Sequence, residues 1–127
     1  MPIDHEIIPE LRLVIARGHG TLTFDDLMQY QMKVWSDPSV EGFDEIADVT
    51  AVENFDYKGS TDVRELAKLS AQMDWVNESR KFAIVAANET AYGLARMYQS
   101  YRDAQSISRK EVRVFETMEQ ARMWLGR

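Results

Sequence analysis

Apolar positions along the chain recur with two different periods, and each change of period marks a predicted element. Five short runs rich in aliphatic and β-branched residues are typical of strands. They cover residues 3–8, 11–18, 45–52, 81–87 and 112–115. The run at 81–87 is apolar on both faces, which predicts a strand buried between two layers. Pro9 and Glu10 predict a turn between two antiparallel strands, and Gly18 and Gly20 are expected to end the second strand.

Between these runs, apolar residues recur at helical spacing. Four helices are predicted, beginning near Thr23, Thr61, Asn88 or Thr90, and Thr117. Thr23 with Asp26 and Thr117 with Gln120 have the spacing of a capping box, in which each residue's side chain binds the other's backbone N–H. The inward stripe of the first helix is apolar except at Gln31.

One glycine conflicts with this helical pattern. Gly93 lies inside the third predicted helix, where Gly costs up to about 1 kcal/mol relative to Ala. A close approach of the helix to the sheet is the expected compensation.

The element order is β-β-α-β-α-β-α-β-α over a single domain, residues 1–127. With right-handed crossovers, it predicts an α/β fold with a mixed, mostly parallel five-stranded sheet and helices packed on its faces. The first strand is its antiparallel edge. Ligands of open α/β sheets tend to bind beyond the carboxyl ends of strands. The longest loop at those ends is expected at 50–59.

Composition narrows the class of protein. No apolar run reaches the eighteen residues that span a membrane, and no basic and apolar leader opens the chain, so we expect a cytoplasmic protein. The absence of cysteine excludes disulfides and thiolate zinc sites. The net charge of −6 argues against nucleic-acid binding. Acidic residues concentrate in 1–57, which holds twelve acids and three bases. Such asymmetry could steer a partner, or mark a solvated region.

The sequence contains no motif that is typical of a metal site or a catalytic centre. The acidic residues at 44, 45, 48, 53 and 56 do not have the spacing of a calcium loop, so no metal site is expected. No nucleophile–base motif and no cofactor loop occurs, so we expect no enzymatic activity and no cofactor.

Several stretches together resemble the bacterial STAS-type proteins, which are related to the anti-sigma-factor antagonists. They are the opening hairpin, RGHGTLTFDDLMQYQ, a strand containing Asp-Val-Thr, IVAANETAYGLARMYQSYRD and VRVFETMEQARMWLG. This branch is also compared with lipid-binding CRAL-TRIO domains. The resemblance covers nearly the whole chain and implies a STAS-like fold.

The resemblance implies a regulatory site at the start of the second helix. In the antagonists a serine there is phosphorylated by a partner kinase. By element order Ser60 is the nearest match and Thr61 the second, although Gly59 stands where the antagonists have Asp. The alternative is that these hydroxyls cap the helix. Asp62 and Glu65 in the same first turn would repel a phosphate.

Four further side chains are candidates for binding a ligand or partner: Tyr57, Tyr98, Arg102 and His19. Tyr98 and Arg102 are spaced i and i+4, so they share a helix face. His19 lies between two glycines beyond a predicted strand end, where it could reach a cleft. Met32, Met97 and Met123 fall off the inward stripes of their helices, which suggests an oligomer contact or an apolar ligand channel.

Two functional hypotheses follow. The first is a non-enzymatic STAS-like protein-interaction module, phospho-regulated at Ser60 or Thr61 and self-associating as a homodimer. The alternative is a binder of a small apolar or lipid-like ligand. That alternative requires a contiguous apolar cavity of several hundred Å³ between helices and sheet.

Overall fold

The computed structural model describes residues 2–56, 59–73, 80–104 and 110–127. Its five strands are β1 (Ile3–Ile8), β2 (Leu13–Thr23), β3 (Asp44–Asp56), β4 (Lys81–Val85) and β5 (Glu111–Phe115). Its helices are α1 (Phe24–Val34), α2 (Ser60–Met73), α3 (Glu89–Asp103) and α4 (Met118–Leu125), with short 3₁₀ turns at Pro9–Leu11 and Pro38–Val40. The predicted element order is confirmed.

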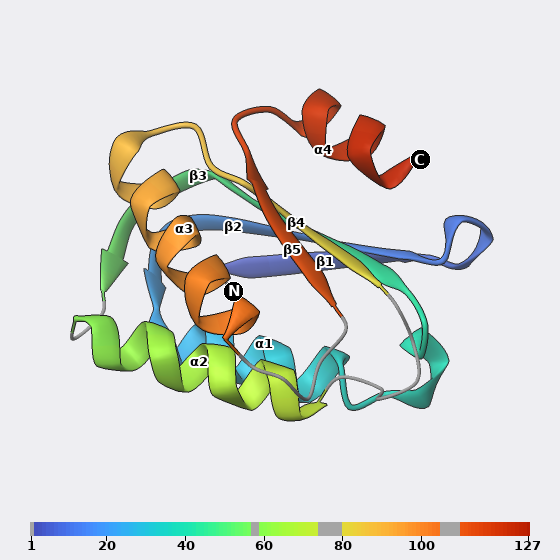
Figure 1. Ribbon diagram of the computed structural model, residues 1–127, viewed down its shortest axis with the longest axis horizontal. Helices are drawn as coiled ribbons and strands as arrows, with labels where there is room; N and C mark the ends of the chain where they lie inside the picture. Colours follow the sequence, from blue (N-terminus) through green and yellow to red (C-terminus); the bar gives the residue numbers. More distant parts are fainter. Residues whose placement is uncertain (1, 57–58, 74–79, 105–109) are drawn as a thin grey trace.

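The strands lie in the sheet in their sequence order, β1-β2-β3-β4-β5. β1 is antiparallel to β2, and the other neighbours are parallel. Each right-handed crossover therefore advances in the same direction and places its helix on the same face. As a result α1, α2 and α3 lie on one face, and α4 packs on the other (Figure 1). The predicted fold class is confirmed.

Successive side chains along a strand point to opposite faces of the sheet, so one strand contributes to the hydrophobic cores on both faces. In β4, Phe82 and Ile84 point into the core beneath α2 and α3, whereas Ala83 and Val85 point into the core beneath α4. All four side chains are buried. The prediction that this strand is covered on both faces is correct.

The helix starts follow local chemistry. Thr23 Oγ1 accepts a hydrogen bond from Asp26 N at 3.1 Å, and Asp26 Oδ2 accepts one from Thr23 N at 2.9 Å. Thr117 and Gln120 form the second capping box, at 3.2 and 3.3 Å. Asn88 caps α3 by accepting from Ala91 N at 2.8 Å. Each cap satisfies an N–H that the helix leaves without a partner.

Two predicted strand ends are wrong. β2 continues past Gly18 and Gly20 to Thr23, because the β2–β3 register shifts after Arg17 and again after Gly20. Such bulges accommodate extra residues without ending the pairing, and Gly20 adopts a φ of +65°. β3 extends alongside β2 to Asp56, so most of the predicted loop at 50–59 is strand.

The expected role of Gly93 is also wrong. A Cβ added there would meet nothing within 4 Å, so no close approach to the sheet requires glycine. The close approach occurs at Gly18 instead, where an added Cβ would lie 2.9 Å from Val52 Cγ2.

Candidate functional site

A cavity of about 140 Å³ lies between the three-helix layer and the sheet. Its lining comes from β2, β3 and β4 of the sheet and from α1, α2 and α3. In the helix layer, α2 packs against both α1 and α3 (Figure 1). Most of its lining is aliphatic or aromatic and includes Leu27, Val49, Phe55, Leu66, Ile84 and Leu94. We call this space the helix–sheet cavity. Apolar walls with a few placed polar groups are typical of small-molecule sites.

Polar lining residues connect the cavity to a buried ion pair. Glu45 Oε1 lies 3.1 Å from Lys110 Nζ, and the two side chains are only 3% and 4% exposed. Tyr30 donates its hydroxyl proton to Glu45 Oε2 at 2.8 Å, and Trp35 Nε1 donates to the Tyr30 oxygen at 3.1 Å. We call these four residues the Glu45 cluster.

Aromatic rings support the cation of this cluster. Lys110 Nζ lies 4.4 Å from the centroid of the Trp35 ring and 5.2 Å from that of Phe82. A ring face attracts an ammonium ion, and more strongly where water is excluded. The ammonium is therefore stabilised by a carboxylate and by two rings at once.

The chemistry of Tyr30 is set by this environment. Burial raises the pKa of its hydroxyl well above the ordinary value, and the negative charge of Glu45 raises it further. The side chain therefore remains a neutral hydrogen-bond donor at physiological pH. It holds Glu45 in place and has the wrong protonation state for a general base.

Of the predicted binding residues, Tyr98 and Arg102 come together. Both are buried, and both bind the Ser70 hydroxyl: Arg102 donates to Ser70 Oγ at 2.6 Å, and the Ser70 and Tyr98 oxygens are 2.6 Å apart. The Tyr98 ring also packs edge-on against Phe82. Tyr98 lines the helix–sheet cavity. The i, i+4 pair thus joins α3 to α2 beside the cavity.

The other predicted residues lie elsewhere. His19 Nε2 pairs with Asp4 Oδ2 at 3.2 Å on the partly exposed β1–β2 ribbon and does not line the cavity. α2 begins at Ser60, so the residue before the helix, where an N-cap would lie, is Gly59. Neither Ser60 nor Thr61 occupies the N-cap position. Thr61 is exposed. Tyr57 and the Ser60 side chain lie outside the described parts of the chain.

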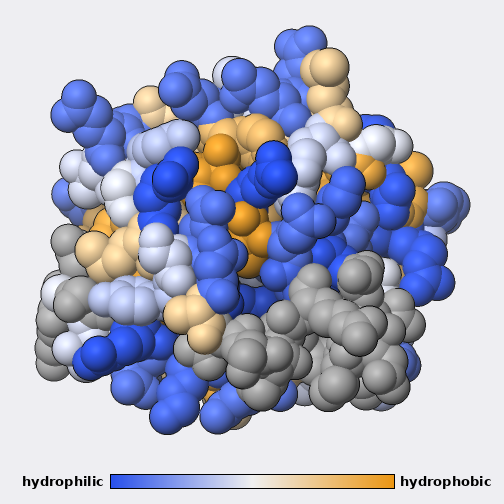
Figure 2. Space-filling view, viewed as in Figure 1, coloured by the Kyte–Doolittle hydropathy of each residue, from blue (hydrophilic) through white to orange (hydrophobic). Residues whose placement is uncertain are grey.

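The outer surface offers less enclosed features. Figure 2 shows an apolar area near the middle of the face that carries β5, bordered by hydrophilic side chains. A second, more open hollow of about 330 Å³ is lined by Tyr92, Val114, Phe115, Glu116 and Gln120.

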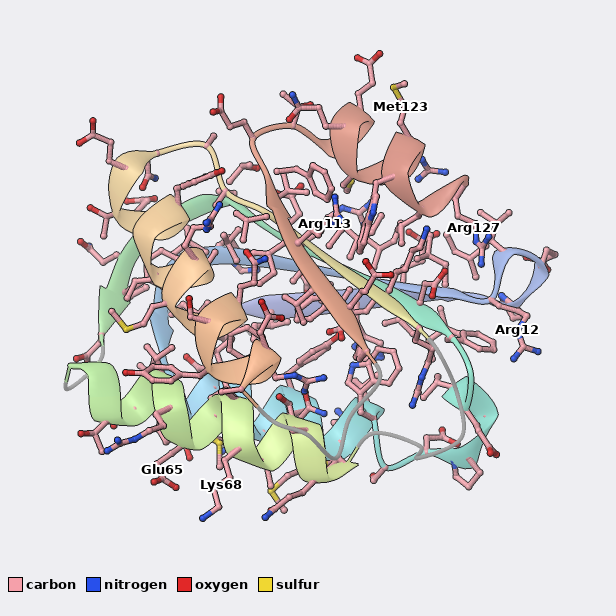
Figure 3. All side chains as sticks on the ribbon, viewed as in Figure 1. Arg12, Glu65, Lys68, Arg113, Met123 and Arg127 are labelled. Carbon is pink, nitrogen blue, oxygen red and sulfur yellow. The ribbon has the colours of Figure 1, made fainter. Side chains whose placement is uncertain are left out.

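Figure 3 shows Met123 pointing outward from α4, and Glu65 and Lys68 pointing outward from α2. Met123 is 76% and Met32 58% exposed, so neither lines an internal channel.

Within the described residues, no three His, Cys, Asp or Glu side chains gather where they could hold one metal ion. None of the described helices has the length and apolar character needed to cross a membrane.

Sequence reasoning missed the Glu45 cluster beside the cavity. Glu45 was placed in the predicted strand 45–52 and weighed only as one of five acids for a metal site, and its burial was not predicted. Its partner Lys110 is 65 residues away, and no local pattern links them. Gln31 did leave a signal, as the single polar member of an apolar helix stripe.

The comparisons with known proteins identify the fold. An uncharacterised protein of the DUF3478 family from Shewanella loihica PV-4, described as having a SpoIIAA-like fold, matches over 97% of this chain and 93% of its own. The TM-score is 0.58 and the identity is 16%. No protein-family profile and no curated protein matches the sequence.

The chain has a SpoIIAA-like, STAS-type fold. The predicted resemblance to STAS-type proteins is thereby confirmed at the level of fold. At this identity the likeness concerns architecture alone. The function has to be argued from the cavity and its lining.

Proposed function

We propose that this protein is a non-enzymatic STAS-like module that binds a small, mainly apolar ligand in the helix–sheet cavity. The observation that carries the proposal is the cavity itself, which is bordered by three helices and the sheet and lined chiefly by aliphatic and aromatic side chains. Filling such a space removes apolar ligand surface from water, which favours binding by roughly 25 cal/mol per Å².

The volume limits the ligand. A cavity of about 140 Å³ is close to the size of engineered apolar cavities of about 150 Å³, which bind benzene. It is smaller than the several hundred Å³ required in the sequence-based hypothesis. The proposed ligand is therefore a single-ring or short-chain molecule, smaller than a lipid.

Toluene is a suitable probe, and the measurement is thermal unfolding with and without it. Ligand at ten times its Kd stabilises the folded protein by about 1.4 kcal/mol, so the unfolding midpoint should rise by several degrees. Ala95→Leu adds three carbons to a buried residue that lines the cavity and should abolish this shift. Ala104→Leu, at an exposed position after α3, is the matched control.

Two results would contradict the proposal. One is an absence of any toluene-dependent shift in the wild-type protein. The other is an equal shift in Ala95→Leu, provided that circular dichroism shows this variant to be folded. Native mass spectrometry of protein purified from cells is a complementary search for a ligand acquired in vivo.

A second candidate function is phospho-regulated protein interaction, and the fold likeness favours it. The supporting observation is that Thr61 is exposed in the first turn of α2, beside Asp62 and Val63, which line the cavity. The helix N-terminus attracts a phosphate, and Asp62, the acid of the first turn, repels it. Phosphopeptide mapping of protein from native cells tests this. Detection of no phosphate on Ser60 or Thr61, together with unchanged partner binding by Ser60→Ala/Thr61→Ala, would count against it.

A further inference from the structure

Gln31 is a polar side chain placed in an apolar environment without an internal partner. It lies on α1, is only 7% exposed and lines the helix–sheet cavity. Within the parts of the chain that the structure describes, its side-chain amide makes no hydrogen bond. The amide is not sealed off, because its polar atoms keep some accessible surface and Gln31 borders the open space of the cavity.

The neighbouring polar groups of the cavity differ from Gln31 because they are already engaged. The Tyr30 hydroxyl donates to Glu45 and accepts from Trp35. Glu45 accepts from Tyr30 and Lys110, and the Tyr98 hydroxyl is bonded to Ser70. These groups hold one another in place. The Gln31 amide, with one acceptor oxygen and two N–H donors, is available to a molecule in the cavity.

The charges of the lining indicate what that molecule carries. The described residues that line the cavity include Glu45, Asp56 and Asp62, and none of them is Lys or Arg. A ligand anion would therefore be repelled. A ligand cation would lose its hydration in a mainly apolar space, while the Glu45 carboxylate is already paired with Lys110. A neutral group escapes both penalties.

From these observations we infer that the ligand of the helix–sheet cavity is a small apolar molecule bearing one neutral hydrogen-bonding group, a hydroxyl or a carboxamide, that pairs with the Gln31 amide. This inference rests on the proposed function of the cavity and names the class of its ligand. The amide selects among ligands of equal size, because a ligand without the polar group leaves it unpaired.

The test compares two probes of nearly equal shape, toluene and phenol, by calorimetric titration of the full chain. Phenol is more strongly hydrated, so a purely apolar cavity prefers toluene. In the wild-type protein we expect phenol to bind at least as tightly as toluene. In Gln31→Met, which keeps the side-chain length but removes the amide, we expect phenol to weaken about tenfold, the effect of one hydrogen bond. Toluene binding should be unchanged or stronger.

Gln29→Met is the matched control, because Gln29 lies on the exposed side of the same helix and bonds Asp25 at 2.7 Å. If Gln31→Met does not fold, Gln31→Leu replaces it. A second readout needs no folded variant: the side-chain amide signal of Gln31 in ¹⁵N NMR should shift on addition of phenol and remain nearly fixed on addition of toluene.

The outcomes separate the inference from the proposed function. If both probes bind and Gln31→Met leaves their affinity ratio unchanged, or if Gln29→Met changes it equally, the inference is overturned and the cavity remains a ligand site. If benzoate or benzylammonium binds more tightly than phenol, the neutral class is wrong. If neither toluene nor phenol binds the wild-type protein, the proposed function is overturned together with the inference.

Discussion

Breaking the buried pair between Glu45 and Lys110 should destabilise the protein severely. The two side chains are 3% and 4% exposed and 3.1 Å apart. In Lys110→Met the Glu45 carboxylate keeps the Tyr30 hydroxyl but loses its adjacent countercharge. An uncompensated buried charge costs about 3–5 kcal/mol. Domains of this size are stable by only about 5–15 kcal/mol, so this one substitution removes a large share.

The assay is urea unfolding followed by circular dichroism, in a double-mutant cycle. Glu45→Gln removes the carboxylate charge while retaining an acceptor for Tyr30. The double variant Glu45→Gln/Lys110→Met should be more stable than Lys110→Met alone, because no buried charge then remains at the pair. Arg17→Met is the control: its pair with Glu6 is about half exposed, at 3.5 Å, and its loss should cost below about 1 kcal/mol. Strict additivity of the two single changes would refute the reasoning.

Three further predictions concern single positions. Gln31→Met should change the free energy of unfolding by less than about 1 kcal/mol, because the amide it removes has no internal partner among the described residues and keeps some accessible surface; a larger loss of stability in urea unfolding would contradict this. Gly93→Ala should stabilise by up to about 1 kcal/mol, since the added methyl group meets open space; an unchanged or lower melting temperature would count against it. Tyr30 has a raised pKa in the folded state, so its contribution is complete below pH 10 and is lost as pH rises from about 10 towards the folded-state pKa, by about 1.4 kcal/mol per pH unit. Urea unfolding between pH 9 and 11 should show a shallower decline for Tyr30→Phe, and equal slopes would argue against the assignment.

The parts of the fold that depend on neighbours in sequence could be predicted. Both capping boxes need only two residues three positions apart, and both form as expected. Element order and right-handed crossovers were enough to predict a mixed, mostly parallel sheet with β1 as its antiparallel edge, and the structure adds the strand order. The strand ends were mispredicted because glycine in a strand permits a bulge as readily as an end. Gly18 and Gly20 lie within such an irregular pairing with β3.

The candidate site could not be predicted in the same way, because it is formed by residues that are distant in sequence and close in space. The cavity reflects how three helices pack over the sheet, and its volume has no signature in any one segment. Tyr98 and Arg102 were paired by helical periodicity, and the structure adds their shared partner Ser70. The polar interruption at Gln31 was visible, but only the structure shows that its amide lies in a cavity without an internal partner.

The separation of Glu45 from Lys110 has a consequence for synthesis on the ribosome. Because successive strands pair, the sheet can assemble one strand at a time as the chain emerges. Lys110, the partner of Glu45, lies 65 residues downstream. At a synthesis rate of about 5–20 residues per second, Lys110 is added about 3–13 s after Glu45. During that interval the nascent β3 carries a carboxylate without its cation. Lys110, the residue just before β5, thus supplies the charge that allows Glu45 to be buried. A chain that ends before Lys110 would therefore bury Glu45 only at the cost of an unpaired charge.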